Sequence, residues 1–172
     1  MKIHLATFYS FDLKRSAERF QRQAKAMNIY DNINIFNPND LNQDFKDFIL
    51  SLLKKGKQRG YGHWVWQTYI HQLMLKKMNE NDIYHWCDVG CHFNIKGINR
   101  LKEYIEIVSK EKNGFLGFTY KKPELLNKFK NYKFASNYEY QYTKADLLKF
   151  FQLKKDDIIV NSPQVWGGSF FI

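Results

Sequence analysis

The sequence lacks several features that define common classes of protein. It contains only two cysteines, Cys87 and Cys91, within one short segment, so a framework of structural disulfides is not expected. No run of about 18 apolar residues occurs, so we expect no transmembrane helix. The first residues do not resemble a signal peptide, because Lys2 and His4 interrupt them. We therefore expect a cytoplasmic protein.

Motifs of several catalytic and cofactor-binding classes are missing as well. No Gly-x-Ser-x-Gly is present, which argues against a serine hydrolase. No Gly-x-Gly-x-x-Gly follows a strand, which argues against dinucleotide binding. Cys87, Cys91 and His92 suggest zinc, but no second pair of ligands follows at the spacing of a zinc finger.

Acidic residues are scarce relative to basic ones, whereas aromatic residues are abundant. The 172 residues include 27 Lys and Arg against 17 Asp and Glu, a net charge of +10, and 15 Phe, 11 Tyr and 4 Trp. This length predicts a single domain over residues 1–172. The charge favours a polyanionic partner, namely nucleic acid, an anionic membrane or a phosphorylated substrate, and does not separate the three. Runs of lysine, such as Lys54–Arg59, are most often simply solvated faces.

The hydrophobic pattern alternates between strand and helix periods. This alternation predicts an α/β domain with a mainly parallel sheet, in which ligands bind beyond the carboxyl ends of the strands. Ser10 and Thr143 are predicted to cap helices. We expect strands at 2–8, 29–36, 83–87, 115–118 and 164–172, and helices at 10–27, 45–53, 66–78, 98–108 and 143–151.

Asp88 lies at the end of the apolar strand 83–87. A carboxylate there suits a divalent cation that holds a diphosphate, because Mg²⁺ and Mn²⁺ prefer oxygen ligands. Gly90 allows the backbone to pass close to a ligand. The alternative is that Asp88 is an ordinary helix-capping or turn residue.

A second candidate segment, residues 59–66, combines a cation, two glycines and several aromatic residues. Arg59 is suited to a bidentate contact with phosphate, and aromatic rings can stack on a base or a sugar. We interpret Trp66 as the first core residue of the following helix. This interpretation leaves Arg59 and Tyr61 as the candidates for ligand contact.

Four blocks together resemble a group of bacterial glycosyltransferases with a GT-A-like nucleotide-sugar fold. Residues 59–66 (RGYGHWVW) resemble the segment RGYGYWxWKP of that family. Residues 82–91 (DIYHWCDVGC), with Asn94, resemble DIxxYxDAGCxxN. The blocks 142–146 (YTKAD) and 164–168 (QVWGG) follow in the same order.

The resemblance implies a Rossmann-type mixed, mainly parallel sheet flanked by helices. It implies transfer of a sugar from a nucleotide-sugar to lipopolysaccharide, capsule or another surface glycan. Asp88 would bind the donor diphosphate directly or through Mg²⁺ or Mn²⁺, and the enzyme would contact anionic lipid at the inner face of the membrane. The residues implied at the donor site are Thr7, Tyr9, Ser10, Arg59, Tyr61, Trp64, Asp88, Gly90, Asn94, Gly167 and Gly168.

The chain departs from the family pattern in two ways. Gly90 stands where many GT-A enzymes carry the second acid of Asp-x-Asp. Family members also continue into a C-terminal segment with a His-x-Asp-Gln-like motif, whereas this chain ends at Ile172, so we expect an incomplete domain that binds a donor more readily than it turns it over. Glu139 and Asp146 are the candidates for a catalytic base.

Two other functions remain open as alternatives. One is a basic, aromatic-rich module that binds nucleic acid. The other is a truncated, inactive glycosyltransferase-like protein. Under the enzyme hypothesis no nucleic-acid partner is expected. The sequence does not determine the sugar, the nucleotide, the acceptor or the stereochemical course.

Overall fold

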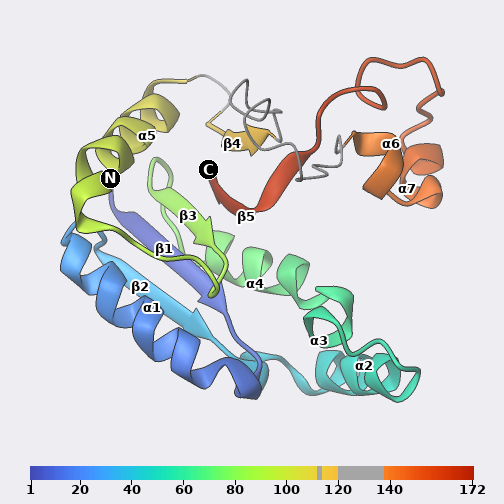
Figure 1. Cartoon of the computed structure of the whole chain (residues 1–172), viewed down its shortest axis with the longest axis horizontal. Coiled ribbons are helices and arrows are strands. Elements are labelled where there is room, and N and C mark those ends of the chain that lie inside the picture. The colour runs from blue at the N-terminus through green and yellow to red at the C-terminus, as the bar shows by residue number, and fades with distance from the viewer. Residues whose placement is uncertain (112–113, 120–137) are drawn as a thin grey trace, which may run out of the picture. The chain divides into compact units, whose positions relative to one another are not determined.

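The computed structural model describes residues 1–111, 114–119 and 138–172. These residues form an α/β fold on a five-stranded mixed sheet of order β2-β1-β3-β5-β4 (Figure 1), which confirms the predicted class. The strands are β1 (Ile3–Phe8), β2 (Asn32–Phe36), β3 (Ile83–Cys87), β4 (Leu116–Thr119) and β5 (Val165–Phe171). The helices are α1 (Lys14–Met27), α2 (Gln43–Lys54), α3 (Gly60–His63), α4 (Trp66–Leu75), α5 (Ile98–Lys110), α6 (Glu139–Tyr142) and α7 (Ala145–Phe150).

The chain divides into two compact units. The first comprises residues 1–116 and 168–172, and the second comprises residues 117–167. The first unit contains β1, β2, β3, helices α1 to α5 and the last residues of β5. The second unit contains α6 and α7. The expectation of one domain over residues 1–172 stays a prediction.

The centre of the sheet is parallel, and β5 runs against it. β1 pairs in parallel with both β2 and β3, with Leu5 opposite Ile33 on one side and opposite His85 on the other. β3 and β5 are antiparallel, with Cys87 opposite Ser169. All five residues of β3 are buried, as expected for an inner strand with both faces covered.

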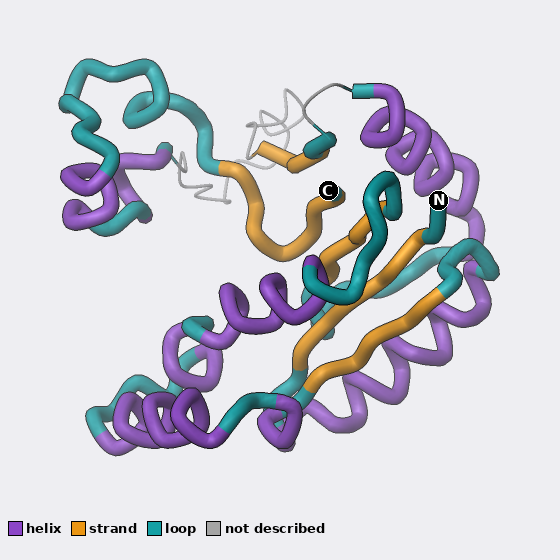
Figure 2. Tube along the Cα trace, turned by 180° about the vertical axis from the view of Figure 1, so that it is seen from behind, coloured by secondary structure: helices purple, strands orange, loops and turns teal. Residues whose placement is uncertain are grey.

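Helices cover both faces of the parallel strands (Figure 2). On one face, Leu5 of β1 packs with Ala17, Phe20 and Ala24 of α1. Met27 continues this buried stripe of α1 at helical spacing. On the other face, Phe8 of β1 packs with residues of α2 and α4, namely Ile49, Trp66, Ile70 and Met74. The prediction that Trp66 is a core residue is confirmed.

Three predicted helix boundaries were wrong. Ser10 precedes a short 3₁₀ turn, Phe11–Leu13, and makes no side-chain cap bond, so α1 begins only at Lys14. The Thr143 hydroxyl donates to the Glu139 carboxylate (2.6 Å) instead of capping, and Lys144 precedes α7. The helix expected to reach Met78 ends at Leu75.

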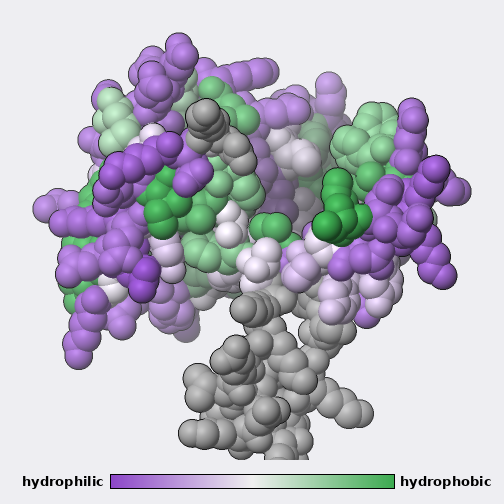
Figure 3. Space-filling model, turned by 90° about the horizontal axis from the view of Figure 1, so that it is seen from above, coloured by the Kyte–Doolittle hydropathy of each residue, from purple (hydrophilic) through white to green (hydrophobic). Residues whose placement is uncertain are grey.

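The surface carries most of the charge. On the face shown in Figure 3, polar side chains predominate and apolar ones appear as separate patches. The basic run at 54–59 is exposed throughout, as expected for a solvated face. Within the described ranges, no helix combines the length and the apolarity needed to cross a membrane.

Candidate ligand-binding site

Asp88 directly follows β3, at the carboxyl end of the parallel strands β1 and β3. Ligands of α/β sheets commonly bind at this edge. The backbone N–H of Asp88 donates to Gly168 O on β5 (2.7 Å), and its carbonyl accepts from the Cys91 N–H (2.8 Å). The Arg19 guanidinium on α1 donates to Val89 O (2.7 Å) and Cys91 O (2.9 Å). The turn 88–91 is therefore held from both β5 and α1.

The Asp88 carboxyl group is half-buried and accepts a hydrogen bond from Trp86 Nε1 at 3.2 Å. Burial raises its pKa to about 6, and the bond from Trp86 opposes this rise only in part. Perturbed carboxyl groups of this kind concentrate at functional sites. Asp88 does begin a turn, but it does not cap a helix. Asn94 instead caps the next helical turn, Ile95–Gly97, by accepting from the Lys96 N–H (3.0 Å).

Residues 60–64 wind in the left-handed sense. Five consecutive residues have φ between 51° and 86°. The N–H groups of His63 and Trp64 donate to the carbonyls of Arg59 and Gly60, four residues back, at 2.9 and 3.0 Å. Each non-glycine residue in this conformation costs about 1–2 kcal/mol of folding free energy. The turn contains three such residues, of which Tyr61 is the first. Backbone strain of this size is found chiefly at functional sites.

Neighbouring side chains hold this left-handed turn in place. Trp66 Nε1 donates to Gly60 O (2.9 Å), and the Arg59 guanidinium lies 5.3 Å from the centroid of the Trp64 ring. A Cβ on Gly60 would lie 2.4 Å from atoms of that ring, so any other residue there would displace the Trp64 side chain. The sequence pattern marked this segment as a candidate for ligand contact and did not predict its left-handed conformation. The alternating glycines at 60 and 62 were the available signal.

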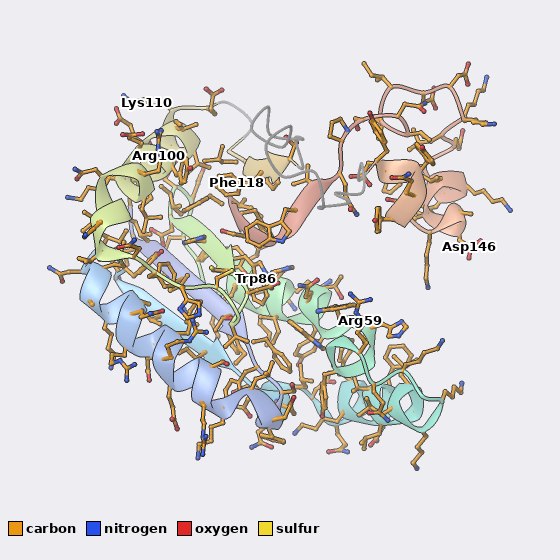
Figure 4. The ribbon with its side chains drawn as sticks, viewed as in Figure 1. Arg59, Trp86, Arg100, Lys110, Phe118 and Asp146 are labelled. Atoms are coloured by element: carbon orange, nitrogen blue, oxygen red, sulfur yellow. The ribbon has the colours of Figure 1, made fainter. Side chains whose placement is uncertain are left out.

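The left-handed turn and Asp88 border the same pocket, which has a volume of about 80 Å³. Figure 4 shows Trp86 on the central strand β3 and Arg59 on the segment before α4. The Phe8 and Trp66 rings stack at 4.0 Å, and Tyr61 lies 6.2 Å from Phe8. The pocket therefore combines aromatic walls with a carboxyl and a hydroxyl group. Its lining residues are Phe8, Ser10, Leu13, Gly60, Tyr61, Trp66, Asp88 and Val89.

Three residues predicted for the donor site meet in this pocket. Ser10, Tyr61 and Asp88 come from the segments after β1, before α4 and after β3. Arg59 and Trp64 are exposed and contact each other. Predicted contacts from separate parts of the chain thus converge on one place.

The remaining predicted residues near β1 and β3 do not line the pocket. Thr7 is fully buried on β1, and its hydroxyl has no hydrogen-bond partner within the described residues. Tyr9 donates its N–H to Phe36 O (3.0 Å). Gly90 is exposed, and a Cβ there would meet nothing within 4 Å, so the space beside it is open.

The predicted residues of the C-terminal third fall into different units. Gly168 belongs to the first unit and accepts the bond from the Asp88 N–H. Gly167, Glu139 and Asp146 belong to the second unit. Asp146 is exposed in the first turn of α7. The two candidate bases therefore stay predictions.

Sequence reasoning missed several residues that shape the site. Arg19 looked like an ordinary charged residue of a helix, yet it holds two carbonyls of the turn. Phe8, Leu13 and Val89 line the pocket and were not among the predicted site residues. The available signal was position alone, since all three lie within a few residues of Ser10 or Asp88.

A metal at this site would have few protein ligands. In the part of the chain that the structure describes, no three His, Cys, Asp or Glu side chains are grouped to hold an ion. Mg²⁺ is often bound by one or two carboxylates together with substrate phosphates and water. Asp88 fits that pattern as a single carboxylate, with the remaining ligands supplied by a bound diphosphate and water.

A buried histidine fixes β5 next to this site. His85 Nδ1 pairs with the Tyr30 hydroxyl at 2.8 Å, and its Nε2 pairs with the Ser169 hydroxyl at 3.0 Å. Its ring stacks on Phe171 with centroids 4.0 Å apart. Burial lowers the pKa of His85 to about 3, so the ring is neutral. This network positions Gly168, whose carbonyl holds the Asp88 N–H.

Comparison of the chain with protein-family models, curated proteins and solved structures finds no significant match. The glycosyltransferase resemblance rests on the four sequence blocks alone. What the chain can bind has to follow from the pocket, and the α/β fold by itself does not decide it.

Proposed function

We propose that the pocket at Asp88 binds part of a nucleotide-sugar, and that the chain is a glycosyltransferase of GT-A-like fold or the donor-binding part of one. The observation that carries the proposal is the convergence of Ser10, Tyr61 and Asp88 on one pocket. These residues were expected at a donor site from three separate segments. They meet at the edge of the sheet where α/β proteins commonly bind nucleotides.

The chemistry of the pocket supports this proposal. A volume of about 80 Å³ suits one group of the donor, with the rest of the ligand outside. Tyr61 offers a ring for stacking and Ser10 a hydroxyl for hydrogen bonding. Asp88 would hold a divalent cation against the diphosphate, and the cation would neutralise the charge that builds up on the departing nucleotide.

The net charge of +10 is compatible with a phosphorylated donor and with contact to an anionic membrane, where a lipid-linked glycan acceptor would lie. Within this proposal the protein acts in the cytoplasm, in peripheral contact with the inner face of the membrane. Transfer with inversion at the sugar would need a base as well as a bound donor. Glu139 and Asp146 are the proposed candidates, and Glu139 is the stronger because its carboxylate is partly buried beside Thr143.

The test is donor binding measured by thermal shift and by titration calorimetry. UDP-, GDP- and CMP-sugars are each added with Mn²⁺, with Mg²⁺ and with a chelator. A ligand present at about 100 times its Kd stabilises the protein by about 2.7 kcal/mol. We expect one nucleotide class to raise Tm, and more so with a cation. If no donor raises Tm, the proposal fails for this chain.

Two matched carboxylate variants test whether the donor-induced rise in Tm depends on the pocket. Asp88→Asn keeps the shape and removes the charge, so we expect the donor-induced shift to be lost. Asp47→Asn makes the same change on the exposed surface of α2, where the carboxylate accepts a hydrogen bond from the Gln43 side chain, and should leave the shift intact. Each shift is taken relative to the ligand-free variant. If Asp88→Asn bound the donor as tightly as the unmodified protein, Asp88 would not contribute to donor binding.

Binding of a single-stranded oligonucleotide tests the nucleic-acid alternative. The exposed run at 54–59 and the Arg59–Trp64 pair are the features that could serve it. Tight oligonucleotide binding that weakens steeply with salt, together with no response to donors, would favour that alternative. Donor binding without hydrolysis or transfer of the sugar would favour the inactive, truncated protein.

A further inference from the structure

The two cysteines of the chain lie on either side of Asp88 and face the same part of β5. Cys87 is the last residue of β3 and lies opposite Ser169 in the antiparallel pair. The Cys91 sulfur lies 3.9 Å from Gly168 O, one residue away on β5. Both cysteines also belong to the apolar cluster beneath α1. Three independent contacts thus bring the two side chains to one place.

The backbone explains why residues four apart in sequence approach each other here. The Cys91 N–H donates to Asp88 O (2.8 Å), which folds the chain back into a tight turn directly after β3. Arg19 holds the far side of this turn through Val89 O and Cys91 O. The Cys91 sulfur thereby lies against Gly168 O, next to Ser169, the residue paired with Cys87 on β5. Both cysteines are free thiols in the structure.

The two thiols differ in their access to solvent. Cys87 is buried, with 5% of its surface exposed, whereas Cys91 is partly exposed at the turn. A small oxidant can therefore reach Cys91 and not Cys87. This is the usual arrangement of an oxidisable cysteine beside a resolving cysteine.

We propose that Cys87 and Cys91 form an oxidative modification site, at which a hydroperoxide converts the two thiols into an intramolecular disulfide. Cys91 sulfur attacks a peroxide oxygen, the O–O bond breaks, and the product is a sulfenic acid on Cys91 and one molecule of alcohol or water. Cys87 sulfur then attacks Cys91 sulfur, the S–O bond breaks, and water leaves with the thiol proton. Two electrons pass from the sulfur pair to one peroxide.

The disulfide encloses the residues that form the rim of the pocket. It closes a ring over residues 87–91, which contains Asp88 and Val89 of the pocket lining. The sulfurs must approach to about 2.0 Å to bond, so the turn must tighten. An effect on donor affinity rests on the proposed function. Formation of the disulfide does not, so the two can fail separately.

The test counts thiols in the unmodified chain, which has two cysteines and gives an unambiguous result. Folded protein is treated with hydrogen peroxide, denatured, alkylated with iodoacetamide and weighed by mass spectrometry. We expect both alkylation sites to be lost together, a mass lower by two hydrogen atoms, and recovery of both sites after dithiothreitol. Non-reducing electrophoresis should show a monomer.

Single variants establish the order of the two steps. In Cys87→Ser, dimedone should trap a sulfenic acid on Cys91, since no thiol remains to resolve it. In Cys91→Ser, the buried Cys87 should keep its thiol at the same peroxide dose. Two outcomes in the unmodified chain would overturn the proposal: both thiols still alkylated after treatment, or a disulfide found only between two chains.

Discussion

Replacing Asp88 with asparagine should stabilise the ligand-free protein at neutral pH while abolishing donor binding. The folded pKa of about 6 lies above the ordinary value of 3.8 because burial disfavours the carboxylate. Asparagine keeps an oxygen that can accept the bond from Trp86 Nε1 and carries no charge. A residue that costs stability and is needed for binding is one kept for function.

The magnitude and its pH dependence follow from the shift in pKa. A rise from 3.8 to about 6 corresponds to about 3 kcal/mol, and solvent at the half-buried carboxylate screens this to about 1–2 kcal/mol. Between these two pH values the unfolded chain has released the proton and the folded chain still binds it. The protonated Asp88 side chain therefore keeps its full stability below pH 3.8, and this stability is lost as pH rises through about 6, where the buried carboxylate becomes a cost.

The assay is chemical or thermal unfolding of both proteins at a series of pH values from 3.5 to about 7.5, a range that brackets the two pKa values. We expect equal stability at the acid end and a more stable Asp88→Asn at the neutral end. The comparison isolates Asp88 because every other titrating group is common to both proteins. A less stable variant at neutral pH, or a difference that does not change with pH, would refute the reasoning.

Three further variants test the supports of the site. Gly60→Ala should lower stability by about 2–5 kcal/mol and abolish donor binding. Gly56 is also at positive φ, but a Cβ there would meet nothing within 4 Å, so Gly56→Ala should cost only about 1–2 kcal/mol. Both changes are measured as shifts in Tm. Arg19→Met leaves two carbonyls without their donor and should cost about 1–3 kcal/mol, whereas Arg22→Met on the exposed face of α1 should change Tm little. His85 is buried and neutral, so its stabilising contribution is present above pH 6.5 and is lost as pH falls toward about 3. His85→Gln should flatten that acid limb of the stability curve.

Much of the fold was predictable because it depends on local patterns. The apolar stripe of α1 and the short, largely apolar run of β3 identify a helix and an inner strand without further information. Helix starts were less predictable, because one hydroxyl can cap, turn or bond to a neighbour. Thr143 illustrates this, since its hydroxyl bonds to Glu139 and the helix starts later.

The sequence alone located Asp88 at the end of a buried strand, because the hydrophobic pattern of the strand and the turn residues after it occupy a few adjacent positions. Only the tertiary structure decided what surrounds that carboxyl group. The left-handed turn at 60–64 depends on Trp66 and on the space that Gly60 leaves for Trp64. The contact of Arg19 with the turn spans about 70 residues of sequence, and no local pattern encodes it. Burial, which raises the pKa of Asp88, is likewise a property of the packed molecule.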